Sequence, residues 1–141
     1  MPVSKTYLVP IDLSEHSEAA LRHALELART NKAKLLLVHV IIEPNVPVPL
    51  RRSYEEILEK GAKVEMAKLI RRNRLKAGEY RVMILWGRDA AELLAEQARK
   101  SRASMIIMGS HGRTGLKHLL LGSVAEKTLR YAQGPVLVVK K

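Results

Sequence analysis

The stretch from Met108 to Ser123, MGSHGRTGLKHLLLGS, combines residue types that can bind an anion. Three of its glycines, Gly109, Gly112 and Gly122, have the spacing G-x2-G-x9-G, and the hydroxyl residue Ser123 follows the last of them. Glycine lets a ligand approach the main chain closely. A loop whose amides point inward and lead into a helix N-terminus forms a site for anionic oxygens. The pattern therefore predicts a phosphate-binding segment.

The charge of the same stretch also favours a polyanion. No Asp or Glu lies between its ends, whereas it carries the nitrogen-bearing side chains of His111, Arg113, Lys117 and His118. A structural interpretation stays open beside this one. Gly109 can be a tight turn, and Ser123 with Glu126 can form a capping box at the start of a helix.

Apolar runs alternate with helical patterns along the chain, which predicts an α/β three-layer sandwich around a parallel sheet. The expected strands are residues 6–12, 33–42, 80–86, 104–108 and 135–141. The expected helices are residues 14–31, about 53–77, 88–100 and 123–132, with a proline-rich loop at 43–50. Ser14 and Asp89 are the expected N-caps of the first and third helix.

The order of the strands decides which residues share a site. In open parallel sheets, ligands bind outside the carboxyl ends of the strands, where the strand order reverses. Asp12 follows the first expected strand and Gly109 follows the fourth. If those strands are neighbours, right-handed crossovers give the order 3-2-1-4-5. We favour this order because the glycine stretch is the stronger feature. The order 2-1-3-4-5, which would bring Gly87 beside Asp12, stays open.

The composition indicates one aliphatic domain. The 141 residues have no internal repeat or linker, and 47% of them are hydrophobic, so we expect a single domain over residues 1–141. The lack of cysteine excludes a disulfide, a thiol nucleophile and a thiolate metal site. No apolar run reaches the roughly 20 residues of a membrane span, and the first residues lack a signal-peptide layout. We therefore expect a cytoplasmic protein with no membrane partner.

The net charge of +11 has two interpretations: attraction of a polyanion, or a solvated basic surface. Much of the excess lies between Lys60 and Gly78. The helix expected there also turns apolar residues towards a core, namely Val64, Ala67, Leu69 and Ile70. No aromatic residues are interleaved for base stacking, and no nucleic-acid-binding motif occurs. We therefore favour a solvated helix face and expect no nucleic-acid partner.

The whole chain resembles the universal stress proteins of the UspA type. Its start, YLVPIDLSEHSEAALRHALELA, is similar to the opening strand and helix of that family, and SMIIMGSHGRTGLKHLLLGSVAEKTLRYAQGPVLVVK to the closing signature. Within the family, the pattern G-x2-G-x9-G-[ST] distinguishes the members that bind ATP, and here it is complete. The resemblance implies the adenine nucleotide alpha hydrolase-like fold with the order 3-2-1-4-5. It also implies a nucleotide-dependent regulatory role in the stress response.

The resemblance further implies a homodimer and the role of each site residue. Asp12, with Pro10 nearby, matches the acidic residue beside the adenosine, and the main chain of Val40 matches the position that recognises the adenine edge. Met108 and Gly109 match the ribose-side wall. The residues matched to the phosphates are His111, Gly112, Gly122, Ser123 and Val124. The dimer would form through the last strand, PVLVVKK, because an apolar edge strand needs covering.

Three of these positions also have structural interpretations. Asp12 precedes a serine by two residues, a common arrangement for an Asx turn into a helix. Val40, taken alone, is indistinguishable from a core valine. His111 can contact phosphate or merely face solvent, and we favour the phosphate contact. His39, by contrast, we interpret as structural within the second strand.

No catalytic or metal-binding residues are predicted. The Walker pattern and the G-x-S-x-G elbow are absent, and no His, Asp and Glu cluster has metal-ligand spacing. ATP hydrolysis needs a group that orients or deprotonates water, and Asp12 is the one carboxylate expected in the crevice. A binding module, with Mg²⁺ or Mn²⁺ carried by the phosphates of ATP, is the favoured hypothesis. The alternatives are a slow ATPase or nucleotidyl-transferring enzyme, and a basic protein that interacts with nucleic acid.

Overall fold

The computed structural model describes residues 5–112 and 121–141. Within them, five parallel strands form one sheet in the order β3-β2-β1-β4-β5. The strands are Thr6–Pro10 (β1), Lys34–Ile42 (β2), Tyr80–Gly87 (β3), Met105–Gly109 (β4) and Val136–Val139 (β5). The helices are Glu15–Asn31 (α1), Val48–Arg72 (α2), Ala90–Lys100 (α3) and Ser123–Tyr131 (α4). The predicted strand order is confirmed, and the order that places β1 beside β3 is wrong.

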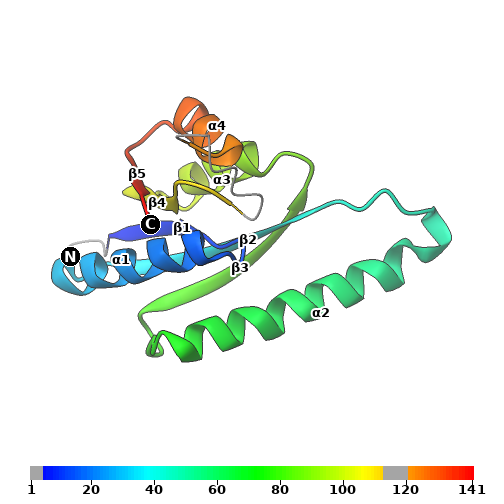
Figure 1. Cartoon of the computed structure of the whole chain (residues 1–141), viewed down its shortest axis with the longest axis horizontal. Helices are drawn as coiled ribbons and strands as arrows, with labels where there is room; N and C mark the ends of the chain where they lie inside the picture. Colours follow the sequence, from blue (N-terminus) through cyan, green and yellow to red (C-terminus); the bar gives the residue numbers. More distant parts are fainter. Residues whose placement is uncertain (1–4, 113–120) are drawn as a thin grey trace.

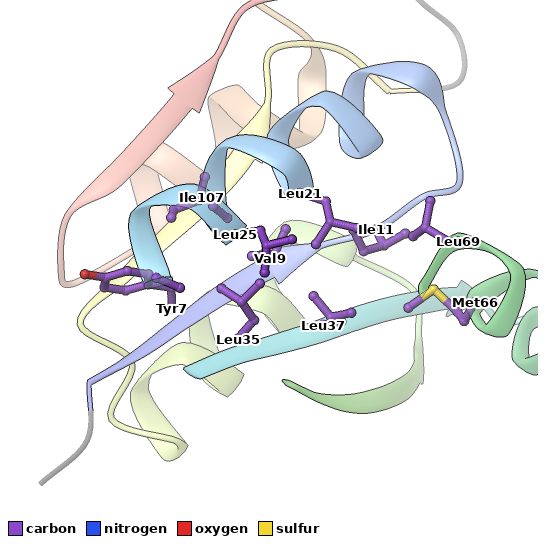
Figure 2. Close-up of a cluster of buried hydrophobic side chains, with 12 residues drawn as sticks. Tyr7, Val9, Ile11, Leu21, Leu25, Leu35, Leu37, Met66, Leu69 and Ile107 are labelled. Carbon is purple, nitrogen blue, oxygen red and sulfur yellow. The ribbon is translucent and has the colours of Figure 1, made fainter. Parts of the chain in front are cut away.

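The helices cover both faces of the sheet, so the fold is the expected three-layer sandwich (Figure 1). Because side chains alternate along a strand, Val9 of β1 packs towards α1 and α2, whereas Leu8 packs towards α3 and α4. Figure 2 shows Leu21 and Leu25 of α1 beside Val9, with Met66 and Leu69 of α2 at the far end of the same cluster. Both core clusters are largely aliphatic, and they hold the carboxyl ends of β1, β2 and β4 in fixed register.

The two predicted N-caps are confirmed. The Ser14 hydroxyl accepts a hydrogen bond from the Ser17 amide at 3.2 Å, and the Asp89 carboxylate accepts one from the Glu92 amide at 3.3 Å. Each cap satisfies an amide of the first helical turn that has no partner within the helix. The starts of α1 and α3 are thereby fixed at the end of the sheet where the carboxyl ends of the strands lie.

Helix α2 begins and ends earlier than its sequence predicts. It covers Val48–Arg72 instead of about 53–77, and its first turn includes part of the proline-rich segment. Pro49 is accommodated because the first helical turn requires no amide donor. At the other end, the Asn73 side chain donates to the Leu69 carbonyl at 2.9 Å, and Arg74 has a positive φ of 56°.

The buried face of α2 also differs in part from the prediction. Leu69 is buried and Ile70 is half-buried, as expected, but Val64 and Ala67 are exposed. The face that packs on the sheet instead follows Ala62, Met66 and Leu69. These positions are one helical turn or two apart, whereas Val64 and Ala67 lie on other sides of the helix.

No helix of the described chain is both long and apolar enough for a membrane crossing.

Candidate functional site

A cavity of about 510 Å³ opens at the carboxyl ends of β1, β2 and β4, next to the first residues of α3 and α4. Small-molecule sites have volumes on the order of 300–1,000 Å³. One part of the lining is aliphatic and consists of Val38, Val40, Ile42, Leu94 and Met108. Polar side chains and glycine backbone from the ends of β1 and β4 and from the start of α4 complete it. The cavity suits a ligand with one flat apolar part and one polar part.

Every site residue predicted from the sequence lines this cavity. These residues are Pro10, Asp12, Val40, Met108, Gly109, His111, Gly112, Gly122, Ser123 and Val124. They meet because β1 lies between β2 and β4, which brings the ends of these three strands side by side. The basic residues Arg113, Lys117 and His118 of the glycine stretch lie outside the described residues.

Asp12 has both a structural contact and a place in the cavity. Its Oδ1 accepts hydrogen bonds from the amide of Ser14, at 2.9 Å, and from the Ser14 hydroxyl. This is the Asx turn that the sequence left open, and it leads directly into α1. The second oxygen, Oδ2, lies beside Gly112, where an added Cβ would be only 2.8 Å from it. One carboxylate oxygen therefore holds the turn while the other lies against the loop that follows β4.

Gly109 and Gly122 permit close backbone approaches around the cavity. A Cβ at Gly109 would lie 2.7 Å from the carbonyl oxygen of His16, in the first turn of α1. A Cβ at Gly122 would lie 3.2 Å from both the Ser110 carbonyl oxygen and the His111 Cα. The Gly122 amide donates to that same Ser110 carbonyl at 2.6 Å. The start of α4 is thus held directly against the segment that follows β4.

Helix α4 begins at Ser123 without a side-chain cap. Its N-cap is Gly122, and the Glu126 amide donates to the Gly122 carbonyl at 2.9 Å. The capping box of Ser123 with Glu126 is therefore wrong, because Ser123 is already inside the helix. The amides of a first helical turn have no intrahelical acceptor and carry a partial positive charge. Since Ser123 and Val124 line the cavity, this end of α4 is suited to an anion.

Two histidines lie together at the polar side of the site. His111 lines the cavity, and its Nδ1 is 3.0 Å from the Ser110 hydroxyl. The ring of His16, from the first turn of α1, has its centroid 5.4 Å from that of His111. The Nδ1 atom of His16 is buried and has no hydrogen-bond partner within the described chain. His16 was not predicted, because a single histidine near a helix start gives no signal in the sequence.

His39 contacts the main chain and not the cavity. Its Nδ1 donates to the carbonyl of Ile11 at 2.6 Å, and so it ties β2 to the residue before Asp12. This contact agrees with the structural interpretation of His39. Over residues 5–112 and 121–141, no group of three His, Asp or Glu side chains is arranged to hold a metal ion.

Comparison with known proteins relates this chain to one protein family. Residues 4–140 match the universal stress protein family. Universal stress protein MJ0531 of Methanocaldococcus jannaschii is 38% identical over 142 residues, which cover 97% of this chain and 82% of the relative. The solved structure of hypothetical protein MJ0577, from the same organism, has a TM-score of 0.85 at 33% identity and covers 99% of this chain and 98% of its own.

A more distant structure has the same fold. The universal stress protein from Archaeoglobus fulgidus, solved in complex with dAMP, has a TM-score of 0.70 at 24% identity. The match covers 99% of this chain and all of the other, 100%. At this identity the likeness establishes the architecture and not the contacts of the site.

Proposed function

The chain belongs to the universal stress protein family, and we propose that it is an ATP-binding member with a single domain over residues 1–141. The observation that carries this proposal is the composition of one cavity. It combines an aliphatic wall, the Asp12 carboxylate and the uncapped first turn of α4. An adenine base, a ribose and a phosphate chain need these three environments in one connected space. The bound or empty state of this site would then regulate contacts of the protein during stress.

The proposal assigns each part of the nucleotide to a part of the cavity. The adenine lies against the aliphatic wall with its edge at the main chain of Val40, and Asp12 accepts from a ribose hydroxyl or from the adenine amine. Met108 and Gly109 flank the ribose. The phosphates lie at the start of α4 and at the segment after β4, against Gly112, Gly122, Ser123, Val124 and His111. Mg²⁺ or Mn²⁺ is carried by the phosphates.

Adenine nucleotides bound to the same architecture support this class of ligand. The Archaeoglobus fulgidus structure contains dAMP, and another universal stress protein structure, with a TM-score of 0.63 at 23% identity, contains cAMP. Their sequences are too distant for a transfer of individual contacts. The assignment of residues therefore depends on the cavity of this chain.

A binding module is favoured over an enzyme. Among the described residues that line the cavity, Asp12 is the one carboxylate, and its Oδ1 already accepts two hydrogen bonds from Ser14. A hydrolase would need a group free to orient or deprotonate water. Single-turnover assays with and without Mg²⁺ separate the two: a binding module leaves ATP intact over the time in which binding reaches equilibrium.

The first test is nucleotide content and binding. Protein is denatured after purification, the supernatant is examined by ion-exchange chromatography with mass detection, and nucleotide-free protein is titrated with Mg-ATP by calorimetry. We expect co-purified ATP or saturable heat from one site. Absence of nucleotide, together with no binding heat at several temperatures, would remove the proposed function while leaving the fold.

A pair of matched variants locates the binding. Val40→Trp fills part of the aliphatic wall, and we expect it to abolish ATP binding. Val82→Trp is the control, because Val82 lies on the neighbouring strand β3, is 41% exposed and does not line this cavity. Equal affinity of both variants for ATP would contradict the location of the site.

The proposal includes a cytoplasmic location and a homodimer through β5. Strand β5 is an edge of the sheet, and its main-chain groups on the open side have no neighbouring strand in the described sheet. Pairing with a second copy would cover this edge.

A further inference from the structure

Exposed basic side chains gather at the amino ends of the strands, which is the end of the sheet opposite the cavity. They belong to the first residues of strands, to the residues just before them, and to the ends of the helices that lead into them. We call this group the basic face. Its residues are Lys5, Lys32, Lys34, Arg74, Lys76, Arg81, Arg99 and Arg102.

The sheet places these residues in one row. The Lys34 amide donates to the Lys5 carbonyl at 2.8 Å, and Arg81 lies opposite Leu36 in the pairing of β3 with β2. The strand order puts the starts of β3, β2, β1 and β4 side by side. Figure 1 shows the last turns of α1 and α2 to the left, on the same side of the molecule as the start of β3. Neighbouring strands are about 4.8 Å apart, so the row is about 15 Å wide.

The chain does not neutralise this charge itself. In the part of the chain that the structure describes, no side chain of the basic face forms an ion pair with a carboxylate. Glu79 lies among them, but its carboxylate accepts from the Arg29 side chain at 2.8 Å and from the Lys76 amide at 2.7 Å. Like charges gathered on one surface attract an anionic partner.

Three residues of the face have a backbone conformation that favours glycine. Lys32, Arg74 and Arg102 have positive φ values of 55°, 56° and 52°, and they follow the ends of α1, α2 and α3. Glycine, or sometimes asparagine, is the usual residue at such a helix end, because a larger side chain is strained there. This chain instead has an exposed Lys or Arg side chain at all three positions. The three cations are therefore present where the backbone alone would favour their absence.

The helix dipole explains only part of the face. The carboxyl end of a helix attracts cations, and this role fits Arg99 in the last turn of α3. It does not account for Lys5, which precedes β1, or for Lys34 and Arg81, which lie at the starts of β2 and β3. The row of cations is thus more extensive than the helix ends require.

We propose that the basic face binds the phosphate backbone of a duplex nucleic acid without reading its sequence. A duplex carries one negative charge per about 1.7 Å of its axis, which gives about nine charges over the width of the row. Phosphate contacts need cations, whereas binding of single strands also uses aromatic side chains on which bases stack, and the face contains none. The exposed large apolar side chains of the described chain lie mainly on α2 and α4, so the face lacks the anchors of a membrane-binding surface.

The face was not evident in the sequence. From the sequence we expect no nucleic-acid partner, because the basic stretch from Lys60 to Gly78 lacks stacking residues and a binding motif. Most of the basic face lies outside that stretch, and its residues come together only when the strands pair. Binding to a duplex backbone needs neither stacking nor a motif. The proposal is independent of the ATP site, since no residue of the face lines the cavity.

Glycine substitutions at the three left-handed positions test the face without weakening the fold. The triple variant Lys32→Gly, Arg74→Gly and Arg102→Gly removes three cations. Its midpoint of chemical denaturation should not fall, because glycine adopts this backbone conformation readily. A matched control lowers the net charge by the same amount through exposed residues of α2 and α4 that are outside the face. Its substitutions are Arg51→Gln, Lys60→Gln and Lys127→Gln.

Fluorescence anisotropy measures binding to labelled duplexes of DNA and of RNA between about 50 and 200 mM salt. We expect the parent chain to bind at least one of them. The slope of log affinity against log salt should become shallower by about 3 in the glycine variant and stay at the parent value in the control. The affinity of the glycine variant for ATP should stay unchanged.

Three results would overturn the proposal. One is a parent chain that binds neither duplex at the lowest salt concentration. Another is an equal change of slope in the control, which would mean that net charge and not the face is responsible. The third is tighter binding to anionic phospholipid vesicles or to polyglutamate than to either duplex, which would assign the face to a membrane or to an acidic protein.

Discussion

At the residue scale, Asp12 links the fold to the site through its two carboxylate oxygens. Oδ1 accepts from the amide and the hydroxyl of Ser14, and Oδ2 lies beside Gly112. In Asp12→Asn, the amide oxygen can keep both bonds to Ser14, while the negative charge and the second acceptor are lost. We expect ATP affinity to fall on the order of tenfold, which is about 1.4 kcal/mol of binding free energy.

The control for Asp12→Asn is the unfolding stability of the same variant. Because the Asx turn is retained, the midpoint of chemical denaturation should stay close to that of the parent chain. Calorimetry and denaturation of the same preparation therefore separate the two roles. Undiminished ATP affinity would mean that Asp12 serves the turn alone.

Gly122 tests the phosphate end of the cavity. A valine there would press against the Ser110 carbonyl and the His111 Cα, both 3.2 Å from the position of its Cβ, and would displace the start of α4. We expect Gly122→Val to lose measurable binding of Mg-ATP by calorimetry. Gly134→Ala is the matched control, because an added Cβ at Gly134 has no atom within 4 Å. Loss of binding in both variants would indicate a general effect on folding instead.

The sequence predicts some of these site residues better than others for a physical reason. Glycines before a helix and a carboxylate after a strand are uncommon enough to mark a ligand site. Leu94, Ile42 and Ala90 also line the cavity but were not predicted. An apolar residue that faces a cavity has the same periodicity as one that faces the core. His16 was missed because its closeness to His111 arises only when α1 packs against the end of β4.

At the scale of elements, an ion pair joins α1 to the end of α2. Arg72 donates to both oxygens of Glu18, at 2.8 and 2.9 Å, and the Asn73 side chain donates to Glu18 at 3.0 Å. The hydrogen bond from Arg72 is the main reason that the pKa of Glu18 lies below its ordinary value. The side chain of Glu18 is 17% exposed, so this pair is screened less than a pair on the open surface.

Glu18→Gln should therefore destabilise the fold in a pH-dependent way. A lowered pKa in the folded state stabilises the protein above the ordinary carboxylate pKa, and this contribution is lost as the pH falls through the folded pKa. We expect the variant to lose on the order of 1 kcal/mol of unfolding free energy at neutral pH. The difference from the parent chain should disappear in acid. Urea denaturation at a series of pH values measures both.

Glu65→Gln is the control for this prediction. Glu65 pairs with Lys68 on the same helix, at 3.2 Å, and both side chains are more than half exposed, at 53% and 58%. We expect it to change stability by less than about 0.5 kcal/mol. A loss as large as that of Glu18→Gln would mean that charge on α2, and not the link to α1, is responsible.

The elements were predictable to different degrees. The N-caps at Ser14 and Asp89 are local features, and the structure contains both. The bounds of α2 were wrong because the prolines before it look like a loop in the sequence, although Pro49 fits a first helical turn. Its buried face was predicted only in part because apolar residues lie on two sides of the helix. Periodicity alone does not tell which of two stripes meets the sheet.

At the scale of the whole molecule, the strand order leaves β3 and β5 as the two edges of the described sheet. Strand β5 bonds to β4 through alternate residues: the Ile106 amide donates to the Pro135 carbonyl and the Ser110 amide to the Val139 carbonyl, each at 3.0 Å. In a parallel strand both main-chain groups of a residue point to the same side, and successive residues alternate between the two sides. Pro135, Leu137 and Val139 therefore face β4. Val136 and Val138 therefore present their amides and carbonyls to the open edge.

This alternation allows a substitution that blocks edge pairing and spares the sheet. Val138→Pro removes an amide that points away from β4, and proline is tolerated at an edge strand in that orientation. If β5 forms the homodimer, the mass of the associated species measured by sedimentation should fall by half in the variant. Its ATP affinity should stay unchanged. A Val138→Pro protein that keeps the mass of the parent chain would place the dimer elsewhere.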